Sequence, residues 1–366
     1  MLLLESAWSL PVAGLVIGSI IGFAARRYHF CTMSALERHW YAGDSSGVRA
    51  WVLAAAVALA LTQSMIALGW IDVSSSFYLT EPLPVAGTIL GGVMFGIGMA
   101  LVGTCGFGAI IRLGGGNMRA LVVLTGIALA ALAAQRGLTG HARLALIDPL
   151  SIDFGGLGGQ SAGAILSSLT SFDLSFPLAI VTATGLFFWV FRDAAFRRNR
   201  ERMISGAIIG AGIAAGWFVT SQLSQHLFEP VQLEAGSFVM PLGDAMLQII
   251  TVTGVLPDYG VGLVGGVLLG ATLSAWRSND MRWEACDDAR ELSRHLLGAF
   301  LMGTGGVFAL GCTIGQGVSA VSVMALSAPI AMISIAFGAR LGLGYLVEGS
   351  AFGFMRRQGH GNMPAE

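Results

Sequence analysis

The chain has 366 residues, of which 55% are hydrophobic and 11% are charged, and its mean hydropathy is +0.74. Because a soluble domain carries about 25% charged residues, this composition excludes a soluble globular protein and predicts an all-α, polytopic membrane protein. The net charge of −1 is uninformative, and no block of like charge resembles an arm that binds nucleic acid.

Apolar runs along the chain predict nine transmembrane helices. The N-terminal stretch "MLLLESAWSLP" has no Lys or Arg and so lacks the basic region of a cleavable signal peptide, and the first run is expected to remain as a span. A further apolar piece, 243–256, is too short to span and predicts an interfacial or re-entrant segment. The nine runs are 9–26, 49–71, 83–104, 117–135, 174–191, 203–221, 259–276, 295–311 and 320–340.

The basic residues, which are all arginines, cluster in alternate loops and so predict the orientation of the chain. Clusters at 26–49, 192–202, 277–294 and 356–357 alternate with the loops "IDVSSSFYLTEP" and "HLFEPVQLEAG", which hold acids and no arginine. The positive-inside rule then predicts an N-terminus outside and a C-terminus in the cytoplasm. Arg136 and Arg143 fall on the outer side, against the rule.

Two parts of the chain share a spacing of glycines and one cysteine. A shift of 207 residues places Gly91, Gly96, Gly98, Cys105 and Gly108 on Gly298, Gly303, Gly305, Cys312 and Gly315. The helix before Cys105 is predicted to run inward and the helix before Cys312 outward, which indicates a divergent inverted repeat, a common plan of transporters. We expect one integral membrane domain over 1–366, with halves of roughly 1–172 and 173–353.

A second echo pairs "GLVIGSIIG" at Gly14 with "GLVGGVLLG" at Gly262, at a shift of 248. The two shifts differ by 41 residues, about one span and a loop. On the assumption of a single duplication, this difference predicts that divergence has altered the number of helices between the halves.

Each repeated cysteine lies among glycines, just after an apolar run. A membrane helix broken at glycine exposes backbone N–H groups, and the start of the next half-helix attracts anions. A neutral thiol there can donate a weak hydrogen bond to a soft acceptor, which favours a sulfur- or selenium-containing anion. The alternative is that these cysteines are small apolar residues and that the glycines only allow close packing. The candidate ligands are Thr104, Cys105, Gly106 and Gly108 in the first motif and Gly311, Cys312, Thr313 and Gln316 in the second.

Arginines near these motifs have two interpretations. Arg112 lies seven residues after Cys105 on the same helical face, where it can offset the charge of an anion or extend to the interface. Arg26 and Arg27, near Cys31, can steer an anion at the inner mouth or simply reflect topology.

The cysteines and motifs also limit the chemistry. The four cysteines form no CxxC pair, so a metal site is not expected. Cys286 lies in a charged amphipathic stretch and is predicted to be a cytoplasmic surface residue. No Walker motif is visible, so neither ATP hydrolysis nor a cofactor is expected.

The motifs "FCTMSAL" at Cys31, "LVGTCGFGAIIRLGGG" at Cys105 and "GCTIGQGVSA" at Cys312 resemble the three cysteine motifs of the YeeE/YedE family, over nearly the whole chain. The resemblance implies a permease of the bacterial inner membrane for thiosulfate or a related sulfur compound. It implies that Cys31, Cys105 and Cys312 lie along a central path and contact the substrate, and that a small cytoplasmic sulfur-carrier protein is a partner. Some relatives are linked to selenium, so a selenium compound stays open as substrate.

The predicted function is therefore transport rather than enzymatic catalysis. A membrane sulfurtransferase, passing sulfur through a cysteine persulfide, is the alternative from another class. An activated nucleophile needs a nearby base, and neither the Cys105 nor the Cys312 motif contains His, Lys or Glu. A structural membrane subunit is a third interpretation, and it predicts that all the cysteines are dispensable.

Overall fold

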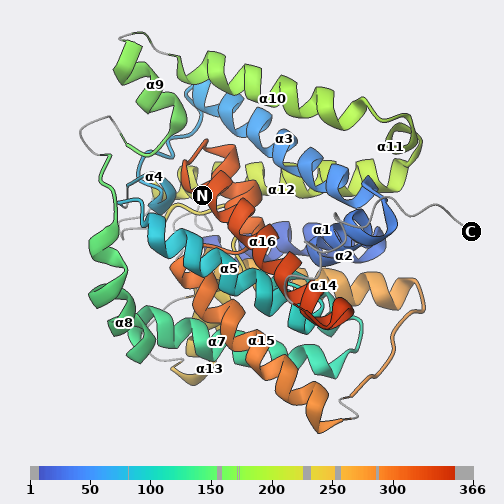
Figure 1. The fold of residues 1–366 in the computed structure, drawn as a ribbon. Helices are drawn as coiled ribbons and strands as arrows, with labels where there is room; N and C mark the ends of the chain where they lie inside the picture. The colour runs from blue at the N-terminus through green and yellow to red at the C-terminus, as the bar shows by residue number, and fades with distance from the viewer. Residues whose placement is uncertain are drawn as a thin grey trace, which may run out of the picture.

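The computed structural model is a bundle of helices joined by loops, with no β-strand among the residues that it describes (Figure 1). These residues are 8–80, 82–154, 159–170, 172, 174–225, 232–251, 257–285 and 288–350. The predicted all-α fold is confirmed. Cys286 lies outside the described residues.

Seven stretches of the described chain are long and apolar enough to cross a membrane. Two other helices match predicted spans: α10 (Ser175–Phe191) is short, with 17 residues, and α15 (Ala289–Phe308) begins with charged residues. The total of nine spans therefore stays a prediction. The seven stretches contain α1 (Ser9–Arg27), α3 (Ser46–Ala67), α5 (Val85–Val102), α7 (Met118–Arg136), α12 (Arg200–Ser224), α14 (Tyr259–Arg277) and α16 (Ser327–Glu348).

Short helices fill the connections between the long ones. They are α2 (Thr32–Glu37), the π-helix η1 (Arg38–Ala42), α4 (Phe77–Thr80), α6 (Gly106–Gly114), α8 (Leu138–Leu146), the 3-10 helix η2 (Asp148–Leu150), α9 (Ala162–Thr170), α11 (Ala194–Arg198), α13 (Met240–Ile250) and the π-helix η4 (Gly315–Ala320). The short apolar segment predicted at 243–256 corresponds in part to α13. The run predicted at 320–340 begins later, as α16, because Met324 adopts a left-handed backbone conformation (φ +57°) that ends the preceding turn.

A left-handed residue ends the helical path shortly before each of three cysteines. His29 (φ +52°) precedes Cys31 and α2, and Gly103 (φ +77°) precedes Cys105 and α6. Leu310 (φ +55°) lies between the end of α15 and Cys312. Each cysteine therefore stands at the start of a new helical segment, at a break in the main-chain hydrogen bonding.

Glycines let α5 and α15 cross closely, and their contacts are reciprocal. A Cβ on Gly91 would come within 2.5 Å of the Gly305 carbonyl oxygen, and a Cβ on Gly98 equally close to the Gly298 carbonyl oxygen. The shift of 207 turns Gly91 into Gly298 and Gly98 into Gly305, so one contact is the image of the other. The falling residue numbers along the partner show that the two helices are antiparallel.

The other long helices follow the same exchange. The contact of α5 with α16 corresponds to that of α15 with α7. The contact of α3 with α12 corresponds to that of α14 with α1. Adding 207 to the bounds of α7, 118–136, gives 325–343, which overlaps α16, and adding it to those of α3, 46–67, gives 253–274, which overlaps α14. These pairings are those expected of an inverted duplication at this shift.

The second echo has a different physical origin. α1 and α14 lie side by side and parallel, with Gly18 against Leu263 and Gly266 against Leu15. Glycines four residues apart face the backbone of the partner along both helices, which is a common way for membrane helices to pack. The glycines of this second similarity therefore serve close packing of α1 on α14, and the predicted change in helix number between the halves stays a prediction.

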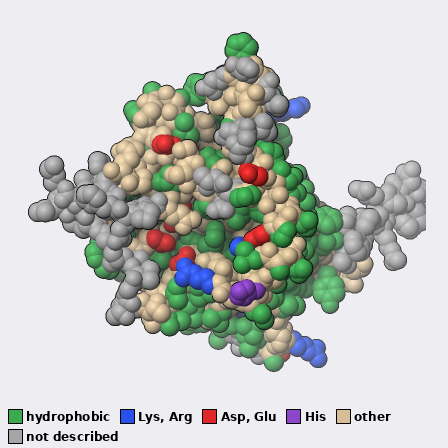
Figure 2. Space-filling model, turned by 90° about the vertical axis from the view of Figure 1, so that its left-hand side faces the viewer, with side chains coloured by type: hydrophobic (Ala, Val, Ile, Leu, Met, Phe, Trp, Pro, Cys, Tyr) green, Lys and Arg blue, Asp and Glu red, His purple; other side chains and the backbone are tan. Residues whose placement is uncertain are grey.

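Several ion pairs lie at the end of the bundle where α1 ends and α3 begins, at the right in Figure 1, whereas Arg143 and Asp148 pair at the opposite end, by α8 (3.5 Å). Arg26 at the end of α1 pairs with Asp280 (3.1 Å), and Arg49 at the start of α3 pairs with Asp193 (3.2 Å). Figure 2 looks onto the opposite end, which carries α4, α8 and α9. Hydrophobic and uncharged atoms cover most of its described surface, and charged side chains are scattered. The described basic clusters, those at 26–49, 192–202 and 277–294, thus lie together, and the cluster at 356–357 lies outside the described residues.

Candidate functional site

Cys105 and Cys312 are buried, with 1% and 0% of their surface exposed. The Cys312 sulfur accepts a hydrogen bond from the Gly315 amide (3.4 Å), three residues on. The Gly108 amide lies near the Cys105 sulfur, as does the hydroxyl of Thr313, although Cys105 makes no side-chain capping hydrogen bond. Both thiols therefore lie beside backbone amides at the start of a helical segment.

Cys31 joins this pair in space although it is far away in the sequence. It is the residue before α2 and is half-buried. Cys105 lies close to both Cys31 and Cys312 and is thus their common neighbour. Cys31 also interacts with Arg202, which places it on the side of the basic end of the bundle.

A chain of hydroxyl groups links two of the cysteine segments. Thr32 and Thr313, each next to a cysteine, approach at 3.5 Å between their oxygens, and the indole of Trp51 donates to Thr32 (3.0 Å). All three side chains are buried. The starts of α2 and of the segment after Cys312 are thereby held against one another.

The other predicted ligands have different environments. Gln316 is fully buried, and its amide group donates to the Ala309 and Leu310 carbonyls (2.7 and 3.2 Å) while it accepts from Ser327. It therefore secures the end of α15. Gly311 has a φ of +154°, which a residue with a side chain rarely adopts.

Two glycines of the first motif leave room for neighbouring groups. A Cβ on Gly108 would overlap the hydroxyl of Thr104. Gly106 is buried at the start of α6. Glycine at 108 is therefore needed for Thr104 to point where it does.

Arg112 lies in the last turn of α6, away from the start where Cys105 is found. Its guanidinium donates to the Gly103 carbonyl (2.9 Å), at the break between α5 and α6. It lines a polar cavity with residues of α7 and α15. Its direct role in the structure is thus to support the helix break.

Several residues near Cys312 carried no signal in the sequence. Tyr78 is buried and lies close to Cys312, and the backbone of Phe238 contacts the Cys312 thiol. The rings of Phe238 and Phe107 pack with centroids 4.8 Å apart. These residues come from α4, from the loop before α13 and from α6, so only the folded chain brings them together.

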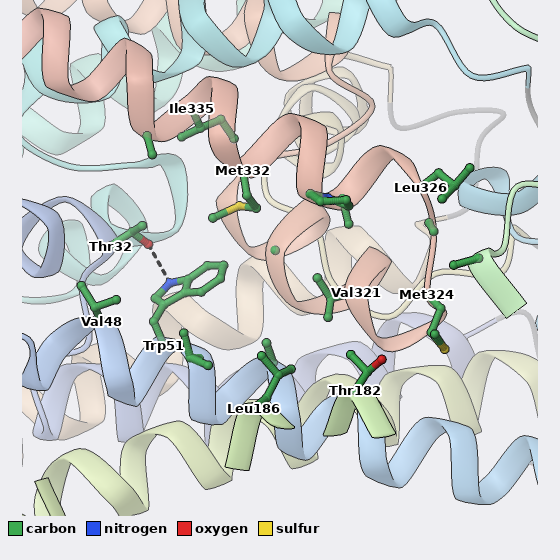
Figure 3. Close-up of a pocket in the computed structure, with 18 of the residues that line it drawn as sticks. Thr32, Val48, Trp51, Thr182, Leu186, Val321, Met324, Leu326, Met332 and Ile335 are labelled. Carbon is green, nitrogen blue, oxygen red and sulfur yellow. Dashed lines mark hydrogen bonds between the residues drawn. The ribbon is translucent and has the colours of Figure 1, made fainter. Parts of the chain in front are cut away.

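A cavity of about 550 Å³ lies beside this centre, between α3, α10 and α16 (Figure 3). Trp51, whose hydrogen bond to Thr32 is drawn, lines it together with Met332 and Val321. Its lining is almost wholly apolar. Because burying an anion among apolar groups is costly, this cavity is not a route for a charged sulfur compound.

Glu234 is a buried carboxyl in the loop before α13, 9% exposed, outside the spanning helices. Burial, and then the nearby Asp258 and Asp244 carboxylates, raise its pKa from 4.5 to about 8, although the Gly260 amide donates to it. The folded protein keeps this proton between pH 4.5 and about 8, where the unfolded chain has lost it. The free energy of unfolding therefore falls as the pH rises through this interval.

We therefore expect Glu234→Gln to raise the apparent Tm of the purified protein by about 2–5 °C near pH 9, because glutamine cannot ionise. Near pH 5 the variant and the wild type should melt alike. Thermal melts at both pH values check this, and Glu201→Gln, at an exposed residue, is the control. Equal melting of Glu234→Gln and wild type at pH 9 would contradict the expected burial of a charge.

Comparison with known proteins adds a family and two relatives. A family model described as "Sulphur transport" matches residues 27–341. A protein of Spirochaeta thermophila named thiosulfate transporter TsuA is 26% identical over 333 residues, which cover 89% of this chain and 96% of the relative. A protein of Escherichia coli K12 with the same name is 24% identical over 352 residues, which cover 90% and 93%.

Proposed function

Because the chain belongs to the sulphur transport family, we propose that it carries thiosulfate, or a closely related sulfur anion, across the bacterial inner membrane. The family match confirms the resemblance to the YeeE/YedE family that the cysteine motifs indicate. Thiosulfate is the substrate in the names of both curated relatives, which match nearly the full length of the chain.

The observation that carries this proposal is the convergence of Cys31, Cys105 and Cys312 at three helix breaks. A thiosulfate dianion needs hydrogen-bond donors in place of its water shell. Backbone N–H groups at the starts of the new segments supply donors, and the thiols supply soft ones. Cys105 and Cys312 would hold the anion at the narrowest part of the central path, and Cys31 would receive it nearer the basic end.

The positive-inside rule makes the basic end cytoplasmic. The N-terminus would then lie outside, the C-terminus inside, and a small cytoplasmic sulfur-carrier protein would receive the product near Cys31. The half-buried position of Cys31 and its interaction with Arg202 support this direction.

We expect Cys31 to react with thiol reagents only from the cytoplasmic side. In inverted vesicles a membrane-impermeant maleimide should label Cys31, whereas in intact cells it should not. Mass spectrometry of the peptide around Cys31 reads the outcome, and Cys31→Ser provides the blank. Rapid labelling in intact cells would reverse the proposed orientation.

Growth and uptake test the function directly. A bacterium that lacks other sulfur importers should grow on thiosulfate as sole sulfur source only when it expresses this protein. Parallel cultures with sulfate, sulfite and selenite decide the substrate class. Growth on all sulfur sources alike, or none, would contradict a thiosulfate importer.

The sulfurtransferase is separated from the importer by the fate of the two sulfur atoms. An importer delivers both atoms of one thiosulfate to the cytoplasm, whereas a sulfurtransferase delivers only the outer one and leaves sulfite behind. Thiosulfate labelled with a different sulfur isotope at each position distinguishes them. Because no His, Lys or Glu lies within the Cys105 and Cys312 motifs, we expect both labels inside the cell.

A further inference from the structure

A polar cavity of about 260 Å³ lies at the basic end, between α5, α6, α7 and α15. Thr104 lines it, one residue before Cys105 in the chain. The cavity is separate from the apolar one beside Trp51, with which it shares no residue. The residues around it are Val102, Thr104, Ala109, Arg112, Asn117, Arg119, Ala120, Val123, Glu284, Glu291, Arg294 and His295.

Two buried polar side chains of this cavity lack a hydrogen-bond partner among the described residues. The hydroxyl of Thr104, which is 2% exposed, has none, and neither has Nδ1 of His295, a residue that is 7% exposed. Leaving a buried polar group unpaired costs about 1–3 kcal/mol. The Thr104 hydroxyl can donate to an anion in the cavity, whereas Nε2 of His295 faces Glu291 at 3.9 Å, which leaves Nδ1 of the neutral ring as an acceptor.

The charges around the cavity favour an anion as that ligand. Three arginines and two glutamates line it, which leaves one positive charge in excess when His295 is neutral. Arg119 is paired with Glu291 (2.7 Å), and Glu284 accepts from the Asn117 amide (2.7 Å). Both carboxylates are thus engaged by donors.

Two of the arginines have guanidinium donors to offer. Arg112 donates to the Gly103 carbonyl through Nη2 only, and no ion pair to Arg294 is found among the described residues. Arg294 is exposed, at the rim of the cavity. A planar guanidinium recognises oxoanions through two parallel hydrogen bonds.

We propose that this cavity is a second anion site, which binds the transported sulfur oxoanion at the basic end of the protein, after the cysteines. The choice of ligand rests on the proposed function; the anion site itself rests on the geometry. Thr104 connects the two sites because its side chain lines the cavity while its backbone leads into Cys105. The site would hold the anion by Thr104 and the arginines before release.

Equilibrium binding of radiolabelled thiosulfate to the purified protein in lipid nanodiscs tests this site. We expect two thiosulfate ions per wild-type chain and one in Arg294→Gln, because Arg294 lines the cavity and belongs to no cysteine motif. Thr104→Val, which removes the hydroxyl and keeps the shape, should weaken the same site, although Thr104 also belongs to the first cysteine motif. The affinity of the lost site should fall about 10-fold or more, since hydrogen bonds to a charged group are broken. Arg290→Gln, on the same helix but outside the cavity lining, should bind two.

The result separates this inference from the proposed function. One thiosulfate per wild-type chain, unchanged by Arg294→Gln and Thr104→Val, would mean that water alone occupies the cavity, and the inference fails even if the cells import thiosulfate. If the cells do not import thiosulfate but the purified protein binds sulfate in a way that Arg294→Gln weakens, the proposed function fails and the anion site stands.

Discussion

Replacing Cys105 or Cys312 with alanine is expected to abolish thiosulfate uptake without reducing the amount of protein in the membrane. Both thiols are buried beside backbone amides at helix breaks, and alanine removes the soft donor from each. A hydrogen bond to a charged group contributes about 1.5–3 kcal/mol, which corresponds to a loss of roughly 10- to 150-fold. Uptake of labelled thiosulfate into cells, normalised to protein level, measures the effect.

Cys286→Ala is the matched control for this experiment, because Cys286 belongs to no cysteine motif of the resemblance and is predicted to lie on the cytoplasmic surface. We expect its uptake to equal that of the wild type. Near-normal uptake by both Cys105→Ala and Cys312→Ala would remove these residues from the substrate site. It would leave the interpretation that they are small apolar residues in a packed interior.

The second large effect is expected from Cys105→Ser, which should lose about 90% of uptake, close to 10-fold, while the protein remains folded. Serine keeps a small hydrogen-bond donor but replaces a polarisable sulfur with a strongly hydrated oxygen. Cys105 occupies the N-cap position of α6, where serine is among the preferred residues. The apparent Tm should therefore be unchanged or slightly higher.

Measuring both the uptake and the apparent Tm of each serine variant separates an effect on substrate binding from an effect on folding. Cys312→Ser is the parallel variant in the second motif, where the sulfur accepts from an amide three residues on. A serine variant with wild-type uptake would show that any small donor suffices and that sulfur has no special role. A stable persulfide on Cys105, together with delivery of only one of the two sulfur atoms, would favour the sulfurtransferase.

The sequence alone determined the class of protein and the positions of two of the three helix breaks, those before Cys105 and Cys312, whereas the break at His29 was found only in the structure. Low charge and long apolar runs leave only membrane helices as a stable fold. Gly103 and Gly311, which adopt backbone conformations that few other residues tolerate, mark where α5 and α15 end. The cysteine that follows each break was therefore visible as a candidate before any contact was known.

Only the tertiary structure decided which residues surround the cysteines and what the neighbouring side chains do. Gln316 could equally have faced a substrate, but its amide is used to hold the end of α15. His295 and Thr104 lie almost two hundred residues apart in the sequence and share one cavity. Such contacts depend on how helices cross, and no local pattern records them.

The two glycine similarities, at shifts of 207 and 248 residues, show the same division between what the sequence and what the structure determines. Glycines at regular spacing indicated close helix packing, but the sequence could not distinguish a duplicated helix from two helices that pack on each other. The antiparallel crossing of α5 and α15 has reciprocal contacts at the shift of 207, whereas α1 and α14 are parallel partners. A small residue is required wherever two backbones approach, whatever their ancestry, so the inverted repeat stays a prediction from the sequence, with which the reciprocal contacts at the shift of 207 agree.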